Sequence, residues 1–348
     1  MNRFAPVLLV AMAALTASAG ASAGDVPLPP ASDNVSAATP AGVDNATWAD
    51  RYHAHFERDM FAMVDWFDRF FGDERIADAA APESSLRWTN DFRWDEADRF
   101  QYRTRVRAWV RLPRLSRKWR IVVSGETRGD QTAVRPEDPG NPGLDVSSPS
   151  RRGSTEIVYD LFRTARTTVD FGAGVRVKIP PNAFVRTRLQ HVRELGFETL
   201  GRLTVIPYWD AKDGFGESNQ VDLERRLAVP TLLRWSSTIG ISERSRAWEW
   251  GTELSLLHRL SDKSAVTLGG GAAGPTRPSV SVQSYRVFTR YRRSFLRHWL
   301  FFELEPDVNW PKQADGGRKP VVGGTFRLEM LFLGSGPPAH RGNPAEAR

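Results

Sequence analysis

Apolar and polar residues alternate along much of the chain, and the pattern is clearest in residues 99–112. Even-numbered positions in this stretch are mostly apolar, from Phe100 to Leu112. The odd-numbered positions include five arginines, Arg99, Arg103, Arg105, Arg107 and Arg111. A period of two puts the two sets on opposite faces of a β-strand. The stretch therefore predicts a strand with one face suited to hydrocarbon and one that needs water or anionic partners.

This period of two continues from residue 85 to residue 332 and predicts about fourteen strands, with twelve as the alternative count. We expect the strands at about 85–94, 99–112, 119–129, 154–164, 167–179, 183–194, 197–209, 218–227, 231–241, 247–258, 264–272, 279–291, 298–308 and 320–332. Such an all-β chain forms either a soluble sandwich, with its apolar faces turned inward, or a membrane barrel, with its apolar faces turned to lipid.

The lengths of the predicted connections decide between a sandwich and a barrel. Long polar connections such as 130–152 and 210–217 alternate with short turns such as 165–166 and 195–196. Short turns on one side and long loops on the other are typical of outer-membrane barrels. A sandwich has no reason to segregate its loops in this way. We therefore predict an antiparallel transmembrane β-barrel of the outer membrane over residues 85–332.

Aromatic residues fall near both ends of the predicted strands. Those near the outer ends are Trp94, Tyr102, Trp209 and Trp248, and those near the inner ends are Trp119, Tyr291 and Trp299. Two aromatic bands are expected where a barrel crosses the two lipid–water interfaces. The last predicted strand closes on Phe332 and resembles the signal that the barrel assembly machinery recognises. Residues 333–348 follow as a polar, proline-rich tail that we predict to be disordered.

Three segments precede the predicted barrel. Residues 1–23 have a positively charged start, an apolar run and the pattern Ala21-Ser22-Ala23, which together predict a cleaved signal peptide. Residues 24–44 are rich in proline, alanine and serine and predict a linker. Residues 45–75 are expected to form an amphipathic periplasmic helix, because apolar residues recur there at steps of three and four. The stripe over residues 45–71 suits the membrane interface, the barrel mouth or an envelope partner protein.

The overall composition narrows the chemistry and the partners. The chain has no cysteine, which excludes disulfides and thiolate catalysis. Its formal net charge is +7, and an exported protein has little access to nucleic acid. The basic excess therefore points to outer-membrane lipid and lipopolysaccharide or to an anion pathway. We expect no nucleic-acid partner and no cofactor.

The face opposite the lipid-facing parity is expected to line the lumen of the barrel. The lumen-lining residues that we single out are Arg99, Arg103, Arg105, Arg107, Arg111, Glu303 and Glu305. Arginine pairs well with carboxylates. The pattern predicts either a pathway that prefers anions or a lattice of charges in an occluded barrel. A barrel of this strand number needs more than wall side chains to fill it, so the helix at 45–71 or the loop at 130–152 would have to do so.

Catalytic motifs are weak in this sequence. It contains no H-E-x-x-H and no G-x-S-x-G, and we assign no catalytic or metal-binding residue. His191 and His258 have the lipid-facing parity, but a lipid-active hydrolase needs a serine beside such a histidine. The run Gly269-Gly270-Gly271 lacks the Lys-Ser/Thr of a phosphate loop, and we predict that it ends a strand as a plain loop.

Five segments carry a resemblance to a known family. They are WFDRFFGDER (66–75), WDAKDGFGES (209–218), LERRL (223–227), TLLRWS (231–236) and YRRSFLRHWLFFELEP (291–306). They are similar to segments of an uncharacterised proteobacterial family of exported outer-membrane β-barrel proteins. The resemblance covers most of residues 60–332 and implies a barrel with a periplasmic helical start, without an assigned activity.

The leading functional hypothesis is passive passage of small anionic solutes through the barrel. The first alternative is a non-channel structural or interaction barrel whose helix binds an envelope protein. A lipid-active outer-membrane hydrolase is the third hypothesis.

Overall fold

The computed structural model describes residues 48–71, 84–97, 99–111, 118–128, 153–177, 180–244, 247–277 and 279–334. Within these ranges one helix, α2 (Trp48–Phe71), precedes fourteen strands. The strands are β1 (Ser84–Asp95), β2 (Arg99–Arg111), β3 (Trp119–Arg128), β4 (Ser154–Arg163), β5 (Thr167–Arg176), β6 (Asn182–Gly196), β7 (Thr199–Asp210), β8 (Gly214–Ala228), β9 (Thr231–Ser242), β10 (Glu249–Ser261), β11 (Ser264–Pro275), β12 (Ser284–Ser294), β13 (Leu300–Pro311) and β14 (Val321–Gly334). The predicted signal peptide, linker and 130–152 loop lie outside the described residues, as does the tail from residue 335.

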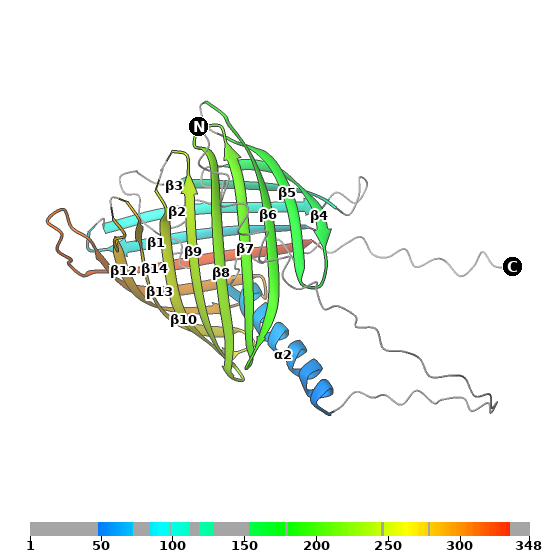
Figure 1. Ribbon diagram of the computed structural model, residues 1–348. Helices are drawn as coiled ribbons and strands as arrows, with labels where there is room; N and C mark the ends of the chain where they lie inside the picture. The colour runs from blue at the N-terminus through cyan, green and yellow to red at the C-terminus, as the bar shows by residue number, and fades with distance from the viewer. Residues whose placement is uncertain are drawn as a thin grey trace, which may run out of the picture. The chain divides into compact units, whose positions relative to one another are not determined.

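The strands form a closed antiparallel barrel (Figure 1). Each strand pairs with its neighbours in sequence, and β1 closes the ring by pairing with β14 as well as with β2. At this seam Leu86 lies opposite Phe332, and Trp88 lies opposite Met330. The predicted strand count is therefore confirmed for the described residues, and the strand that ends near Phe332 is the one that completes the closure.

The largest departures from the predicted elements are two connections and the run of three glycines. The predicted loop at 210–217 is a turn of residues 211–213, because β8 begins at Gly214, directly opposite Asp210. The Asp210 carboxylate accepts hydrogen bonds from the backbone N–H groups of Lys212 and Asp213, at 2.9 and 3.0 Å, and this closes the turn tightly. β12 begins at Ser284 rather than at 279. The run Gly269–Gly271 lies inside β11 and is paired on both sides.

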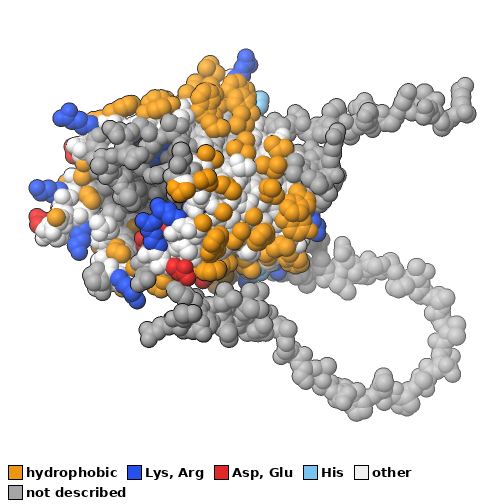
Figure 2. Space-filling model, turned by 90° about the horizontal axis from the view of Figure 1, so that it is seen from above, with side chains coloured by type: hydrophobic (Ala, Val, Ile, Leu, Met, Phe, Trp, Pro, Cys, Tyr) orange, Lys and Arg blue, Asp and Glu red, His pale blue; other side chains and the backbone are white. Residues whose placement is uncertain are grey.

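The outer face of the barrel is apolar and the inner face is polar. On β2, Phe100 is 64% exposed and Val110 is 48% exposed, whereas the arginines alternate with them. On β9, Arg234 is buried while its neighbour Trp235 is exposed. Hydrophobic side chains cover much of the strand surface seen in Figure 2. This distribution is the inverse of a soluble sandwich, so the predicted orientation of the faces is confirmed.

Exposed aromatic residues lie at the ends of several strands, as predicted. Trp94 and Trp209 are each the second-last residue of their strands, β1 and β7, while Trp119 is the first residue of β3. All three are exposed on the barrel surface. Successive strands run in opposite directions, so Trp119 lies at the opposite rim from the other two. Each rim therefore carries at least one exposed tryptophan, and tryptophan is a residue favoured at a lipid–water interface.

The second half of α2 lies inside the barrel. Its residues Met60, Val64, Phe67 and Phe70 form one buried cluster with wall residues from five strands, Leu200, Leu232, Leu257, Ala265 and Phe301. Leu200 and Leu232 have the same strand parity as the buried Arg202 and Arg234. Leu257 lies opposite Leu232, and Ala265 and Phe301 lie opposite the buried Arg292 and Glu329, so all five point inward. A helix that packs against the inward face of strands from β7 to β13 must lie within the ring. No helix of the described residues is long and apolar enough to cross a membrane.

Candidate functional site in the barrel interior

A row of charged residues crosses the inner wall beside the seam. Arg103 on β2 lies opposite Asp91 on β1, Asp91 lies opposite Arg327 on β14, and Arg327 lies opposite Glu303 on β13. Arg292 on β12 continues the row opposite Glu303. Directly opposite residues of neighbouring strands point to the same face of a sheet. The row therefore brings basic and acidic residues from the first two and the last three strands of the barrel together on the inward face.

Ion pairs connect this row from strand to strand. Arg105 Nη2 lies 2.9 Å from Asp91 Oδ2, and Arg327 Nε lies 2.6 Å from Asp91 Oδ1. Arg327 also reaches Glu303, with its Nη1 2.9 Å from Oε1. Charged pairs at these distances are stronger than neutral hydrogen bonds. Arg327 thus links two carboxylates on two strands, and the pairs run along the wall rather than across the interior.

The acidic residues of β13 are paired with arginines of the neighbouring strand β12. Arg290 Nε lies 2.6 Å from Glu305 Oε2 and 3.4 Å from Glu303 Oε1. Arg286 also bonds Glu305. Both carboxylates are buried, so each charge is stabilised by these guanidinium groups instead of by bulk water.

The structure places six of the seven residues predicted to line the lumen on the inner wall of the barrel and the seventh at its rim. Glu303 and Glu305 join the network directly, and Arg105 joins it through Asp91. Arg103 stands in the row opposite Asp91. Arg107 and Arg111 continue along β2 on the same parity, half-buried. Arg99 is the first residue of β2 and is exposed, so it lies at the rim.

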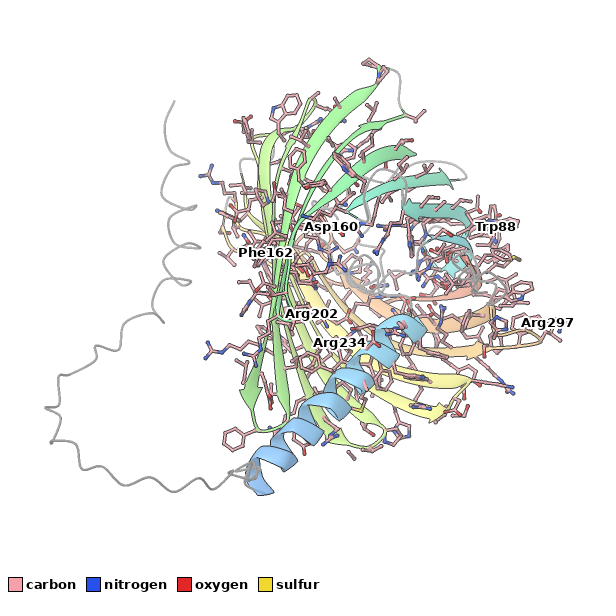
Figure 3. The ribbon with its side chains drawn as sticks, turned by 90° about the vertical axis from the view of Figure 1, so that its right-hand side faces the viewer. Trp88, Asp160, Phe162, Arg202, Arg234 and Arg297 are labelled. Atoms are coloured by element: carbon pink, nitrogen blue, oxygen red, sulfur yellow. The ribbon has the colours of Figure 1, made fainter. Side chains whose placement is uncertain are left out.

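A second cluster of charges lies where α2 meets the wall. The Asp68 carboxylate lies between two arginines, with Oδ2 3.3 Å from Nη2 of Arg202 and with Oδ1 bonded by Nη2 of Arg234. Glu224 on the wall strand β8 contacts the same two guanidinium groups. Its Oε2 lies 3.5 Å from Nη2 of Arg202, and its Oε1 lies 2.7 Å from Nη2 of Arg234. In Figure 3 the labelled Arg202 and Arg234 both lie beside α2. All four side chains are buried.

Sequence reasoning missed the role of Asp68. The signal for it was present, because Asp68 lies four residues after Val64 and therefore shares the apolar face of the helix. An acidic residue on such a face needs a cationic partner when the helix docks. The wall carries a matching signal. Leu200 precedes Arg202 by two residues and Leu232 precedes Arg234 by two, so apolar and basic positions follow each other on the inward face.

Aromatic contacts connect the helix to the charge network at the seam. The Arg292 guanidinium lies 4.5 Å from the centre of the Phe301 ring and 5.8 Å from that of Phe70 on α2. The same guanidinium pairs with Glu329, with Nη2 2.8 Å from Oε1. Such cation–π contacts are attractive, more so when the cation is desolvated. Arg292 therefore belongs both to the helix contact and to the wall network.

The two lipid-facing histidines each bond a threonine. Thr167 Oγ1 lies 2.9 Å from His191 Nδ1, and Thr231 Oγ1 lies 2.8 Å from His258 Nδ1. Each threonine is the residue directly opposite the histidine on the neighbouring strand. Neither bond is the Ser–His contact that the hydrolase hypothesis requires. Across the described residues, no cluster of three or more histidine, aspartate or glutamate side chains is arranged to hold a metal ion.

The chain has structural neighbours at low similarity. The outer membrane channel DcaP of Acinetobacter baumannii is 8% identical with a TM-score of 0.43, and the match covers 72% of this chain and 96% of that one. A loop L8 deletion mutant of OmpT, an outer membrane protein of Vibrio cholerae, is 10% identical with a TM-score of 0.45, covering 72% and 98%. The high-pH structure of Pseudomonas putida OprB is 9% identical with a TM-score of 0.44, covering 75% and 97%.

No protein-family model matches the chain, and no curated protein matches its sequence. At the identities and TM-scores of the structural neighbours, the likeness carries no information on the solute or on the site. The assignment of the fold and the site rests on the strand pairing and the side-chain contacts described above.

Proposed function

We propose that the chain is an outer-membrane channel that passes small anionic solutes. The observation that supports this most directly is the combination of a closed barrel, an apolar outer face and a charged inner wall. A closed barrel satisfies its backbone hydrogen bonds within the ring, which a membrane-spanning structure requires.

The preference for anions follows from the distribution of charge along the wall. The odd-numbered positions of β2 from 103 to 111 carry Arg103, Arg105, Arg107 and Arg111 and no acidic residue. On the neighbouring β1 the inward positions carry Arg87 and Arg93 as well as Asp91 and Asp95. The two strands together give this sector of the wall a basic surplus. Rings or stripes of arginine are the feature that selects anions in pores.

The barrel surface supports partners that the sequence led us to expect. The exposed apolar side chains would contact outer-membrane lipid, and basic residues at the rims would contact lipopolysaccharide or other anionic headgroups. The strand β14, with Phe326 and Phe332 exposed on the outer side, would be the segment that the barrel assembly machinery binds before β1 and β14 pair.

Conductance across a planar lipid bilayer tests this function. The purified full-length chain is inserted, and the reversal potential is measured under a gradient of potassium chloride. We expect discrete openings whose reversal potential has the sign of anion selectivity. A cation-selective reversal potential would overturn the anion preference, and a complete lack of conductance from the wild type and from the variant of Asp68 described below would overturn the channel.

A second candidate function is a barrel that does not conduct. It is favoured by one observation, the position of α2 within the ring, where Phe67 is completely buried against the wall. If the helix stays there permanently, the protein serves a structural role, or it binds an envelope protein through the first half of α2. A photocrosslinking residue at Trp48 tests the second role, because it should then link to another envelope protein in cells.

A further inference from the structure

Asp68 is held by the barrel wall in the way that a bound anion would be held. Its side chain is 1% exposed, and its two oxygens face different guanidinium groups, those of Arg202 and Arg234. The arginines come from β7 and β9, with β8 between them. Two arginine side chains that converge on one carboxylate are a typical arrangement for carboxylate recognition.

The arginines are positioned by residues that belong to the wall itself. Glu224 on β8 approaches both guanidinium groups, and its own side chain is fully buried. The neighbouring Asp222 accepts hydrogen bonds from Gln220 Nε2, at 2.9 Å, and from Ser236 Oγ, at 2.6 Å. The contacts of Glu224 do not involve α2, so Glu224 would still hold both guanidinium groups if the helix moved away.

From this geometry we propose that Arg202 and Arg234 form a carboxylate-binding site in the barrel interior. In the state seen here Asp68 occupies the site as a ligand tethered by α2, and a carboxylate solute opens the channel by displacing it. The proposal rests on the proposed channel function and names the class of solute that the channel recognises.

The charges around the site favour a singly charged ligand. Asp222 lies opposite Arg202 and Glu224 lies opposite Arg234 on the neighbouring strands, and these carboxylates offset the charge of the arginines. An anion with two or more charges, such as phosphate, would be repelled by these carboxylates more strongly than a monocarboxylate, which matches the charge of Asp68. Arginine also binds the planar, two-oxygen geometry of a carboxylate in a way that it cannot bind chloride.

The surroundings of the site also favour an apolar group on the ligand. Leu200 and Leu232 lie two residues before the two arginines on the same inward face, and they are at most 2% exposed in the docked state. When Phe67 and the rest of the helix stripe withdraw, this apolar surface becomes available. A short-chain monocarboxylate such as butyrate would place its carboxylate on the arginines and its alkyl chain on these leucines.

The helix side of the proposal is tested with Asp68→Asn and a matched control, Asp65→Asn. Both substitutions remove one negative charge from α2, but Asp65 pairs with Arg69 on the helix itself, at 2.9 Å, and is partly exposed. Single-channel recordings in potassium chloride measure the fraction of time that each full-length protein is open. We expect Asp68→Asn to raise the open fraction about tenfold or more, as the loss of a buried charged hydrogen bond implies. Asp65→Asn should behave as the wild type.

The ligand side is tested by replacing part of the chloride with butyrate at constant ionic strength. We expect butyrate to raise the open fraction of the wild type until it saturates, and phosphate at the same ionic strength to do so much less. Butyrate should leave the open fraction of Asp68→Asn unchanged, because no tethered ligand remains to be displaced. Arg234→Lys keeps the positive charge but removes the planar guanidinium group that can donate two parallel hydrogen bonds to a carboxylate. It should shift the butyrate response to higher concentration.

The outcomes separate this proposal from the channel function. If wild type and Asp68→Asn open equally often with the same anion selectivity, the tethered-ligand proposal is wrong and the channel function stands. If phosphate acts as strongly as butyrate on the wild type, the assignment to monocarboxylates is wrong. If neither protein conducts although both migrate as folded barrels in cold gel electrophoresis, the channel function itself fails.

Discussion

At the scale of single residues, buried and largely buried arginines hold the barrel wall together through shared carboxylates. Arg327 is the clearest example, because its side chain is 12% exposed and it joins Asp91 of β1 to Glu303 of β13. A buried charge that loses its partner is strongly destabilising, whereas an exposed pair contributes little. The contribution of an arginine to stability in this protein therefore depends on its burial more than on its distance from a carboxylate.

This difference predicts the effect of Arg327→Gln on stability. We expect the substitution to lower the free energy of unfolding by about 3 kcal/mol, at the low end for a broken buried pair, because Asp91 keeps its contact with Arg105. The control is Arg244→Gln, which removes an exposed pair with Asp213 and should cost less than about 1 kcal/mol. Urea unfolding in lipid vesicles, followed by tryptophan fluorescence, measures both. Equal losses for the two variants would contradict the argument.

At the scale of elements, the alternation of apolar and polar residues specifies the strands, but no comparable pattern specifies where the helix lies. Alternation alone predicts a strand, because only a period of two keeps one face apolar. The errors occurred where local side-chain chemistry sets a boundary, such as the turn closed by Asp210. The helix stripe was equally compatible with lipid, a partner or the barrel, because an apolar face does not specify what covers it. Its docking depends on the inward leucines and arginines of β7 and β9, which come together only after β7, β8 and β9 have paired.

The glycines inside β11 show a further feature that alternation cannot predict. Gly269 lies opposite Phe288 of β12, and a Cβ atom on Gly269 would lie 2.5 Å from the ring atom Cζ. The ring of Phe288 is buried between the guanidinium groups of Arg286 and Arg290, which lie 4.9 and 5.2 Å from its centre. The glycine therefore makes room for an aromatic ring on the inner wall. The run continues the strand because its residues pair with both β10 and β12.

This packing predicts a cost for Gly269→Ala. We expect the free energy of unfolding to fall by about 1–3 kcal/mol, because the Phe288 ring has to shift away from its two arginines. The matched control is Gly125→Ala on β3, where a Cβ atom would meet no other atom within 4 Å. That variant should change stability by less than about 0.5 kcal/mol. The same urea titration compares the two, and a neutral Gly269→Ala would show that the ring moves freely.

At the scale of the whole molecule, the closed ring determines which environment each residue meets. A strand in a soluble protein turns its apolar face to a core, but in this protein the core positions at the seam are charged and the outer surface is apolar. Ring closure also joins the two ends of the barrel sequence at β1 and β14, so residues more than 200 positions apart form ion pairs. The orientation of the faces is thus a property of the whole barrel, and it fixes what lipid and solute can contact.

Labelling at introduced cysteines tests this orientation directly, because the chain has no cysteine of its own. Val123 and Ser124 are neighbours on β3; Val123 is 45% exposed on the outer face, while Ser124 points inward and its Oγ lies 2.9 Å from that of Ser154. An environment-sensitive nitrobenzoxadiazole label is attached to Val123→Cys, to Ser124→Cys and to Asp315→Cys, which lies in the exposed connection after β13.

In vesicles that contain lipids with a nitroxide on the acyl chain, we expect strong quenching at position 123 and weak quenching at 124 and 315. A lipid-embedded barrel requires this alternation between adjacent residues, because successive side chains point to opposite faces. Equal quenching at 123 and 124 would mean that β3 does not have lipid on one side and the barrel interior on the other.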